Sequence, residues 1–136
     1  MKDSSQWTLL HHAAFEGNLK IVDILLKTKI DIESVNTHKQ TALHLAVQQG
    51  FFDITKKLIE RGANINVLDD EKNNILHYCS QNDHIELLKY LLEKSPTYLI
   101  LEKNIFGKAP KDLVKDKEIR IIFNNLAITN SSNVKE

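Results

Sequence analysis

The chain repeats one short segment at a fixed interval, and this repeat limits its possible folds more than any other feature. The segment TLLHHAA at residues 8–14 returns as TALHLAV at 41–47 and, weakened, as NILHYCS at 74–80, each copy 33 residues after the last. A second apolar cluster follows each copy in the same register, and a shorter fourth unit begins at Ala109. So short a unit cannot cover its own apolar face, so we expect successive units to stack.

Each unit predicts two short helices joined by a tight turn. In unit two the first helix lies near residues 41–49, and the Thr41 hydroxyl can accept hydrogen bonds from free N–H groups at its start. Gly50 follows that helix, as Gly17 does in unit one, and glycine readily takes the left-handed conformation that ends a helix. The second helix is expected near residues 52–61, where apolar side chains recur on one face.

These units resemble the ankyrin repeat, whose unit runs Asp-x-x-Gly-x-Thr-Pro-Leu-His-Leu-Ala, then a glycine, a second helix and a Gly-Ala-Asp type of turn. The family's histidine recurs as His11, His44 and His77, and unit two keeps the closing turn as residues 62–64. The opening glycine survives only as Gly107 and the proline only as Pro110. The resemblance covers about residues 3 to 125, nearly the whole chain.

The resemblance implies an all-α fold, an ankyrin-repeat solenoid of stacked helix-turn-helix units with β-hairpin or turn fingers projecting from one edge. The expected domain is 1–126, with repeats near 3–35, 36–68, 69–103 and 104–126, the last a short C-terminal cap. Residues 127–136 are small and polar, and we expect a loose polar tail there. Unit one begins almost at Met1, which favours a complete small protein.

Composition excludes several classes of function. Eighteen basic residues balance eighteen acidic ones, so no positive field is available to attract nucleic acid or an anionic membrane. Apolar runs are far shorter than the roughly 20 residues that span a bilayer. The single cysteine, Cys79, excludes an intrachain disulfide and suits a reducing compartment. We therefore expect a cytoplasmic location, with the nucleus as the alternative, and a monomer without membrane insertion.

The six histidines raise the possibility of a metal site. Histidines that recur every 33 residues lie in successive layers roughly 8–10 Å apart, whereas zinc needs its ligands at about 2 Å. We favour hydrogen-bonded struts, in which His44 bonds the Thr41 hydroxyl across the first helical turn and a backbone carbonyl of the adjoining hairpin. No metal ligand, cofactor-binding residue or cofactor is predicted.

No catalytic residue is predicted either. Cys79 lies in a column of small residues and has no basic neighbour, and His77, two positions away on a helix, does not face it. The chain has only four glycines, and none forms a motif that cradles phosphate. A standalone enzyme or metal protein stays a remote alternative that a metal assay would test.

The packing of the repeat does not dictate the identity of every residue, and the positions that it leaves open form a strip. It combines finger-tip positions with the last positions of the first helices, which stacking places along one side of the array. Aromatic and amide side chains are typical of interface cores, so Trp7, Phe15 and Phe106 are the expected anchors. The acidic run at 69–71 would favour a basic patch on a partner. The predicted partner-binding residues are Trp7, Phe15, Glu16, His38, Gln40, Gln48, Gln49, Asp70, Glu71, Asn73, Gln81, Asn82 and Phe106.

Family members mostly bind other proteins through finger tips and the inner face of the first helices. The leading hypothesis is therefore a non-enzymatic protein–protein interaction module, either an adaptor or an inhibitor, that binds a protein partner through its concave face. The alternative is the recognition region of a larger enzyme, such as a kinase, phosphatase or acyltransferase. No motif names the partner.

Overall fold

The computed structural model describes residues 5–82 and 84–134, with side chains described as far as residue 125. The regular secondary structure of this part of the chain is all helical, with loops between the helices and no strand. The elements are α1 (Leu9–Glu16), α2 (Leu19–Leu26), α3 (Ala42–Gln49), α4 (Phe52–Glu60), α5 (Ile75–Gln81), α6 (Ile85–Lys94), the 3-10 helix η1 (Thr97–Ile100), α7 (Pro110–Leu113) and α8 (Lys117–Val134).

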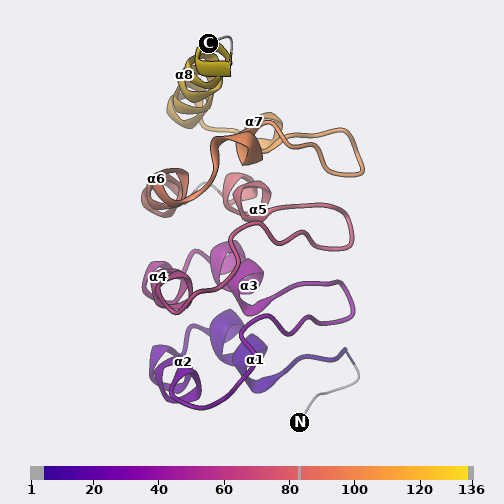
Figure 1. The fold of residues 1–136 in the computed structure, drawn as a ribbon, viewed down its shortest axis with the longest axis vertical. Coiled ribbons are helices and arrows are strands. Elements are labelled where there is room, and N and C mark those ends of the chain that lie inside the picture. Colours follow the sequence, from indigo (N-terminus) through magenta and orange to yellow (C-terminus); the bar gives the residue numbers. More distant parts are fainter. Residues whose placement is uncertain (1–4, 83, 135–136) are drawn as a thin grey trace.

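The helices stack in two columns (Figure 1). The first helices of the units pack in succession, α1 on α3, α3 on α5 and α5 on α7, while α2 packs on α4 in the second column. The loops that precede α3, α5 and α7 project to the opposite side of the first column as fingers. The expected all-α solenoid is confirmed.

Equivalent positions of successive units build one continuous core. Leu43 and Leu76 from the first helices, with Leu58 and Leu91 from the second, are all within 1% of complete burial. Burial of one such side chain contributes about 1.5–3 kcal/mol, which only a stacked neighbour can supply to a unit of two helices.

The helix ends follow the sequence signals. The Thr8, Thr41 and Asn74 side chains accept hydrogen bonds from backbone N–H groups in the first turns of α1, α3 and α5. α1 and α3 end at Gly17 and Gly50, each left-handed with φ of 78°. In unit three the position that corresponds to Gly17 and Gly50 is Asp83, which lies outside the described residues, as do residues 1–4.

Each finger is a tight turn rather than a paired hairpin strand. One backbone hydrogen bond links each finger to the next: Thr37 N to Ser5 O, Asp70 N to His38 O, and Ile105 N to Glu71 O, at 2.9–3.0 Å. A single bond per pair is too few to form a ladder. Where the family has its opening glycine, Gln6, Lys39 and Lys72 adopt φ of 59–63°, and Gly107 adopts 74°.

The C-terminal region differs from the expected loose tail. α8 runs from Lys117 to Val134, so its backbone stays helical through most of the segment 127–136. Extension costs little once a helix is nucleated, because each added residue gains one backbone hydrogen bond. Ile119 and Phe123 of α8 are buried, and the helix packs on η1 and α7.

Candidate functional site

The recurring histidines tie each first helix to the next finger. In His11, Nδ1 accepts from Thr8 N at 2.9 Å, and the other ring nitrogen lies 2.8 Å from Gln40 O. Because Nδ1 accepts a backbone N–H, Nε2 carries the proton and donates to the carbonyl. The same pair of contacts recurs from His44 to Asn73 O at 3.4 Å and from His77 to Lys108 O at 2.8 Å. The interpretation as structural struts is confirmed.

Burial keeps the His44 and His77 rings neutral. Loss of solvation lowers the pKa of His44 from 6.5 to about 4, and the same cause lowers the pKa of His77. Over residues 5–82 and 84–134, no three His, Cys, Asp or Glu side chains are grouped so that they could hold a metal ion. The imidazoles therefore act through hydrogen bonds within the fold.

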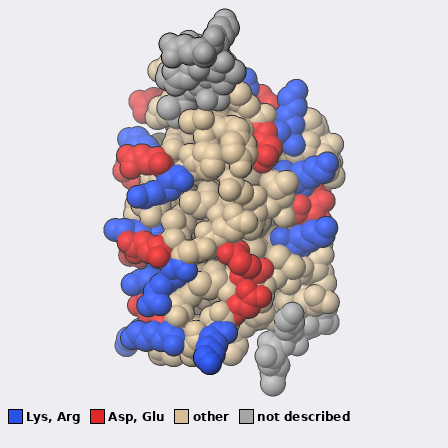
Figure 2. All heavy atoms as spheres, viewed as in Figure 1, with Lys and Arg blue, Asp and Glu red and all other residues tan. Residues whose placement is uncertain are grey.

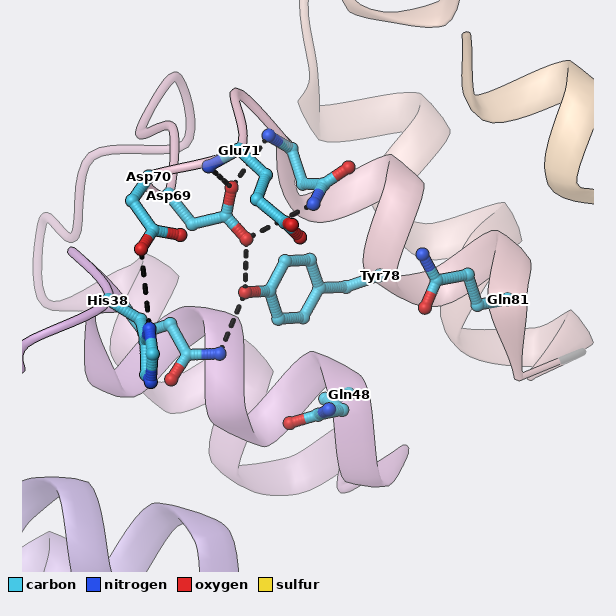
Figure 3. Close-up of a pocket in the computed structure, with 9 residues that line it drawn as sticks. His38, Gln48, Asp69, Asp70, Glu71, Tyr78 and Gln81 are labelled. Carbon is cyan, nitrogen blue, oxygen red and sulfur yellow. Dashed lines mark hydrogen bonds and ion pairs between the residues drawn. The ribbon is translucent and has the colours of Figure 1, made fainter. Parts of the chain in front are cut away.

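A polar groove lies where the second and third fingers meet the exposed side of α3 and α5 (Figure 3). We call it the finger–helix groove, and it encloses about 420 Å³. The acidic residues stand on its finger side, whereas Gln48 and Gln81 project from the helices. Its lining residues are His38, Gln40, Gln48, Asp69, Asp70, Glu71, Asn73, Tyr78 and Gln81.

Tyr78 stands at the centre of a hydrogen-bond network in this groove. Its hydroxyl donates to Asp69 Oδ2 at 2.6 Å and accepts from Gln40 Nε2 at 2.8 Å (Figure 3). Asp69 also accepts the backbone N–H groups of Glu71 and Asn73 through Oδ1, at 2.9 and 2.8 Å. These bonds join α5 to two fingers, so the floor of the groove is held in one arrangement.

The groove has an acidic character. Among the described residues that line it are three carboxylates and no Lys or Arg. His38 Nδ1 lies 3.3 Å from Asp70 Oδ2, but both side chains are largely exposed, so water screens this pair. Burial and the bond to Asp69 raise the pKa of the Tyr78 hydroxyl, which therefore stays a neutral donor. The groove is suited to receive a cationic group.

Seven of the predicted strip residues line this one groove: His38, Gln40, Gln48, Asp70, Glu71, Asn73 and Gln81. Asn82 lies beside it, because its Nδ2 donates to Gln48 O at 3.0 Å. Gln49 is exposed at the end of α3. Phe106 stands on the fourth finger with 64% of its surface exposed, so it does not pack into its own hairpin.

Trp7, Phe15 and Glu16 belong to a separate patch on unit one. The Trp7 ring lies 5.3 Å from the Phe15 ring and 5.0 Å from the His12 ring, between centroids. Trp7 is half-buried by these neighbours, while Phe15 and Glu16 stay exposed. None of the three is among the groove's lining residues, so the strip divides into a polar groove and an aromatic patch.

Two residues of the groove were not predicted as binding residues. Asp69 occupies the opening position of its unit, and Tyr78 the column of His12 and Leu45. The sequence did contain a signal for Tyr78. A tyrosine in a column of core residues needs a hydrogen-bond partner for its hydroxyl when it is buried. Its partner could be identified only once the fingers were placed.

Outside the groove, neither the single cysteine nor the charged edges indicate a reactive or binding site. Cys79 is buried, and the loss of solvation raises the pKa of its thiol to about 12, which keeps it protonated and unreactive. Figure 2 shows lysines and carboxylates gathered along the edge formed by α2, α4 and α6, and again along the finger edge. The charges on the helical edge are typical of a solvated surface, since interface cores are depleted in Lys, Glu and Asp.

The stacked helix pairs, projecting fingers and histidine struts define a helical-repeat solenoid with a polar groove between fingers and helices. A family model described as ankyrin repeats, in three copies, matches residues 10–104. The chain belongs to the ankyrin-repeat family, whose domains are generally non-catalytic modules for protein–protein interaction. A comparison with curated proteins gives no match. No helix in the described part of the chain is long and apolar enough to cross a membrane.

Proposed function

We propose that this chain is a non-enzymatic adaptor or inhibitor that binds a protein partner through the finger–helix groove. The observation that supports the proposal most directly is the convergence of seven strip residues on one groove. These residues come from two fingers and two helices, so no local demand of a single helix explains their grouping. The buried, reduced Cys79 is consistent with a cytoplasmic or nuclear location.

The chemistry of the groove favours a basic side chain from the partner. Asp70 and Glu71 are exposed at the finger tip, and their carboxylates would attract a Lys or Arg during approach. Gln48 and Gln81 add amide groups that can donate to and accept from a peptide backbone. Tyr78 is only 6% exposed, so it forms a rigid floor of the groove, held by two hydrogen bonds.

The test begins with affinity capture from source cells, followed by calorimetry with the purified partner. Joint replacement of Phe15, Gln48 and Gln81 by Ala is expected to weaken binding by more than about 2 kcal/mol. All three side chains are at least partly exposed, so helix content by circular dichroism should barely change.

The matched control reverses the charges of Lys27, which follows the last residue of α2, and of Lys56 and Lys89 on α4 and α6. This control should change binding little, and mainly through the association rate. If the lysine variant abolishes binding while the Phe15, Gln48 and Gln81 variant does not, the partner uses the outer helical edge and the proposal is wrong. An adaptor is distinguished from an inhibitor by whether the bound partner keeps its own activity.

A further inference from the structure

The fourth finger ends in two exposed apolar side chains on a fixed backbone. Ile105 is 55% exposed and Phe106 is 64% exposed. Asn104 Oδ1 accepts hydrogen bonds from Phe106 N at 2.9 Å and from Lys108 N at 3.1 Å. Ile105 N donates to Glu71 O of the third finger at 2.9 Å. The tip therefore presents an apolar surface whose backbone is already ordered, so a contact with it has little ordering cost.

Phe106 stands at the position that forms the finger side of the finger–helix groove. His38, Glu71 and Phe106 are the third residues of fingers two, three and four. In each of these fingers the first residue donates its backbone N–H to the carbonyl of the fifth, at 2.9–3.1 Å, and the fourth residue has a positive φ. Equal backbone geometry directs equivalent side chains the same way, and His38 and Glu71 both line the groove. Phe106 therefore continues this side of the groove into unit four.

The helix side of the groove changes in the same direction. Tyr78, on the floor of the groove, corresponds to Leu113, the half-buried last residue of α7. We call Ile105, Phe106 and Leu113 the apolar extension. Because α5 packs on α7, the apolar extension adjoins the acidic groove, and together they form one surface.

The distribution of charge indicates what can occupy this surface. Asp70 and Glu71 line the groove, whereas Lys72 of the same finger does not. Lys39, which holds the position of Lys72 in finger two, lines a different crevice. Lys108 is exposed at the base of finger four, beside the apolar extension. A cationic group of a partner is therefore favoured in the groove and not at the extension, where an apolar group is favoured.

We propose that the occupant is an extended segment of the partner, with a basic side chain against Asp70 and Glu71 and an apolar side chain against Phe106 and Leu113. This inference rests on the proposed function, because it names the kind of segment that the groove binds. Packed helices such as α5 and α7 lie roughly 8–10 Å apart, and an extended chain advances about 3.3 Å per residue. The basic and the apolar residue of the segment are thus about three positions apart.

Selection of a random dodecapeptide library on the whole chain tests this pattern before the partner is identified. We expect the selected peptides to share a Lys or Arg about three positions from an aliphatic or aromatic residue. One selected peptide, and a version of it in which Ser replaces the apolar residue, then serve as the two probes for calorimetry.

Phe106→Ser removes the centre of the apolar extension, and Ile121→Ser is the matched control, because that isoleucine is 58% exposed on α8. We expect Phe106→Ser to weaken the selected peptide at least ~fivefold and Ile121→Ser to leave its affinity unchanged. The serine version of the peptide should bind the Phe106→Ser variant as tightly as it binds the original chain, because its partner group is already missing. Glu71→Gln should weaken both peptides at least ~threefold, and less at high salt. Circular dichroism verifies that the variants stay folded.

Several results would overturn the proposal. Selected peptides that lack the basic residue, or lack the apolar one, would show that the occupant has another chemistry. Equal effects of Phe106→Ser and Ile121→Ser would remove the apolar extension from the site. A library that yields no binding peptide would exclude an extended segment.

The proposed function is judged by a different result. If Phe106→Ser has no effect while Glu71→Gln weakens binding, the groove acts without the apolar extension, so this inference fails and the proposed function stands. The proposed function fails only if the captured partner does not need Phe15, Gln48 and Gln81.

Discussion

Replacement of His44 by Ala tests the strut that connects unit two to unit three. The ring is fully buried, and its Nδ1 accepts the N–H of Thr41 at 3.1 Å. Loss of this acceptor leaves a buried donor unsatisfied, at a cost of about 1–3 kcal/mol. The contact to Asn73 O is long, at 3.4 Å, and adds little, while the space left beside the Tyr78 ring adds about 1 kcal/mol. We expect a total loss of about 2–4 kcal/mol.

Equilibrium urea denaturation followed by circular dichroism measures this loss. His38→Ala is the matched control, because 68% of that side chain is exposed and its replacement should cost less than about 0.5 kcal/mol. If the two variants have the same stability, His44 is not a strut. Zinc should not raise the melting temperature, and a zinc-dependent rise that His44→Ala abolishes would restore the metal hypothesis.

The pH dependence of stability provides a second readout of the same ring. The pKa of His44 is about 4 in the folded chain and 6.5 in the unfolded chain, so the unfolded state binds more protons between these values. The contribution of the neutral ring is complete above pH 6.5 and is lost as pH falls towards 4, by up to about 3 kcal/mol. His44→Ala should lose the part of this slope that His44 contributes, while the part from His77 remains, and His38→Ala should retain both.

Three further predictions concern turns and the thiol. Lys72→Gly should stabilise the chain by about 0.5 kcal/mol in urea denaturation, because Lys72 has the left-handed φ of 63° that glycine adopts more easily. Lys29→Gly is the control and should give no gain, because Lys29 is not left-handed. Gly50→Ala should cost more than about 1 kcal/mol, because φ is 78° and a Cβ would meet the His84 ring at 2.5 Å; an unchanged melting temperature would contradict this packing. Cys79 should react with iodoacetamide only as fast as the chain unfolds, and faster labelling would show an accessible thiolate.

Local signals were sufficient to predict the repeat and its helices. The 33-residue period specifies which columns are apolar, and Thr8 and Thr41 mark helix starts because their hydroxyls can bond nearby backbone. The role of His44 was also accessible, since Thr41 lies one helical turn away. Such features depend on residues within a few positions of one another, or on a register that recurs along the chain.

The composition of the groove was decided by contacts between units. Tyr78 bonds Asp69 within its own unit, and Gln40, 38 residues before Tyr78, reaches the same hydroxyl from the preceding unit. Trp7 lies apart from the groove, because its ring packs against the His12 and Phe15 rings of its own unit. These contacts depend on how far each finger projects over the next helix, and the sequence pattern does not contain that distance.

The two ends of the array also separate what the sequence determines from what the tertiary structure determines. The sequence by itself determined that Leu9 and Ile21 are apolar like their counterparts in the later units, because both follow the repeat. Only the tertiary structure showed that α8 packs over one end, whereas at the other end Leu9 and Ile21 are exposed among the residues that the structure describes. The physical reason is that burial belongs to a pair of surfaces, so an apolar residue is in the core or exposed according to what stacks against it.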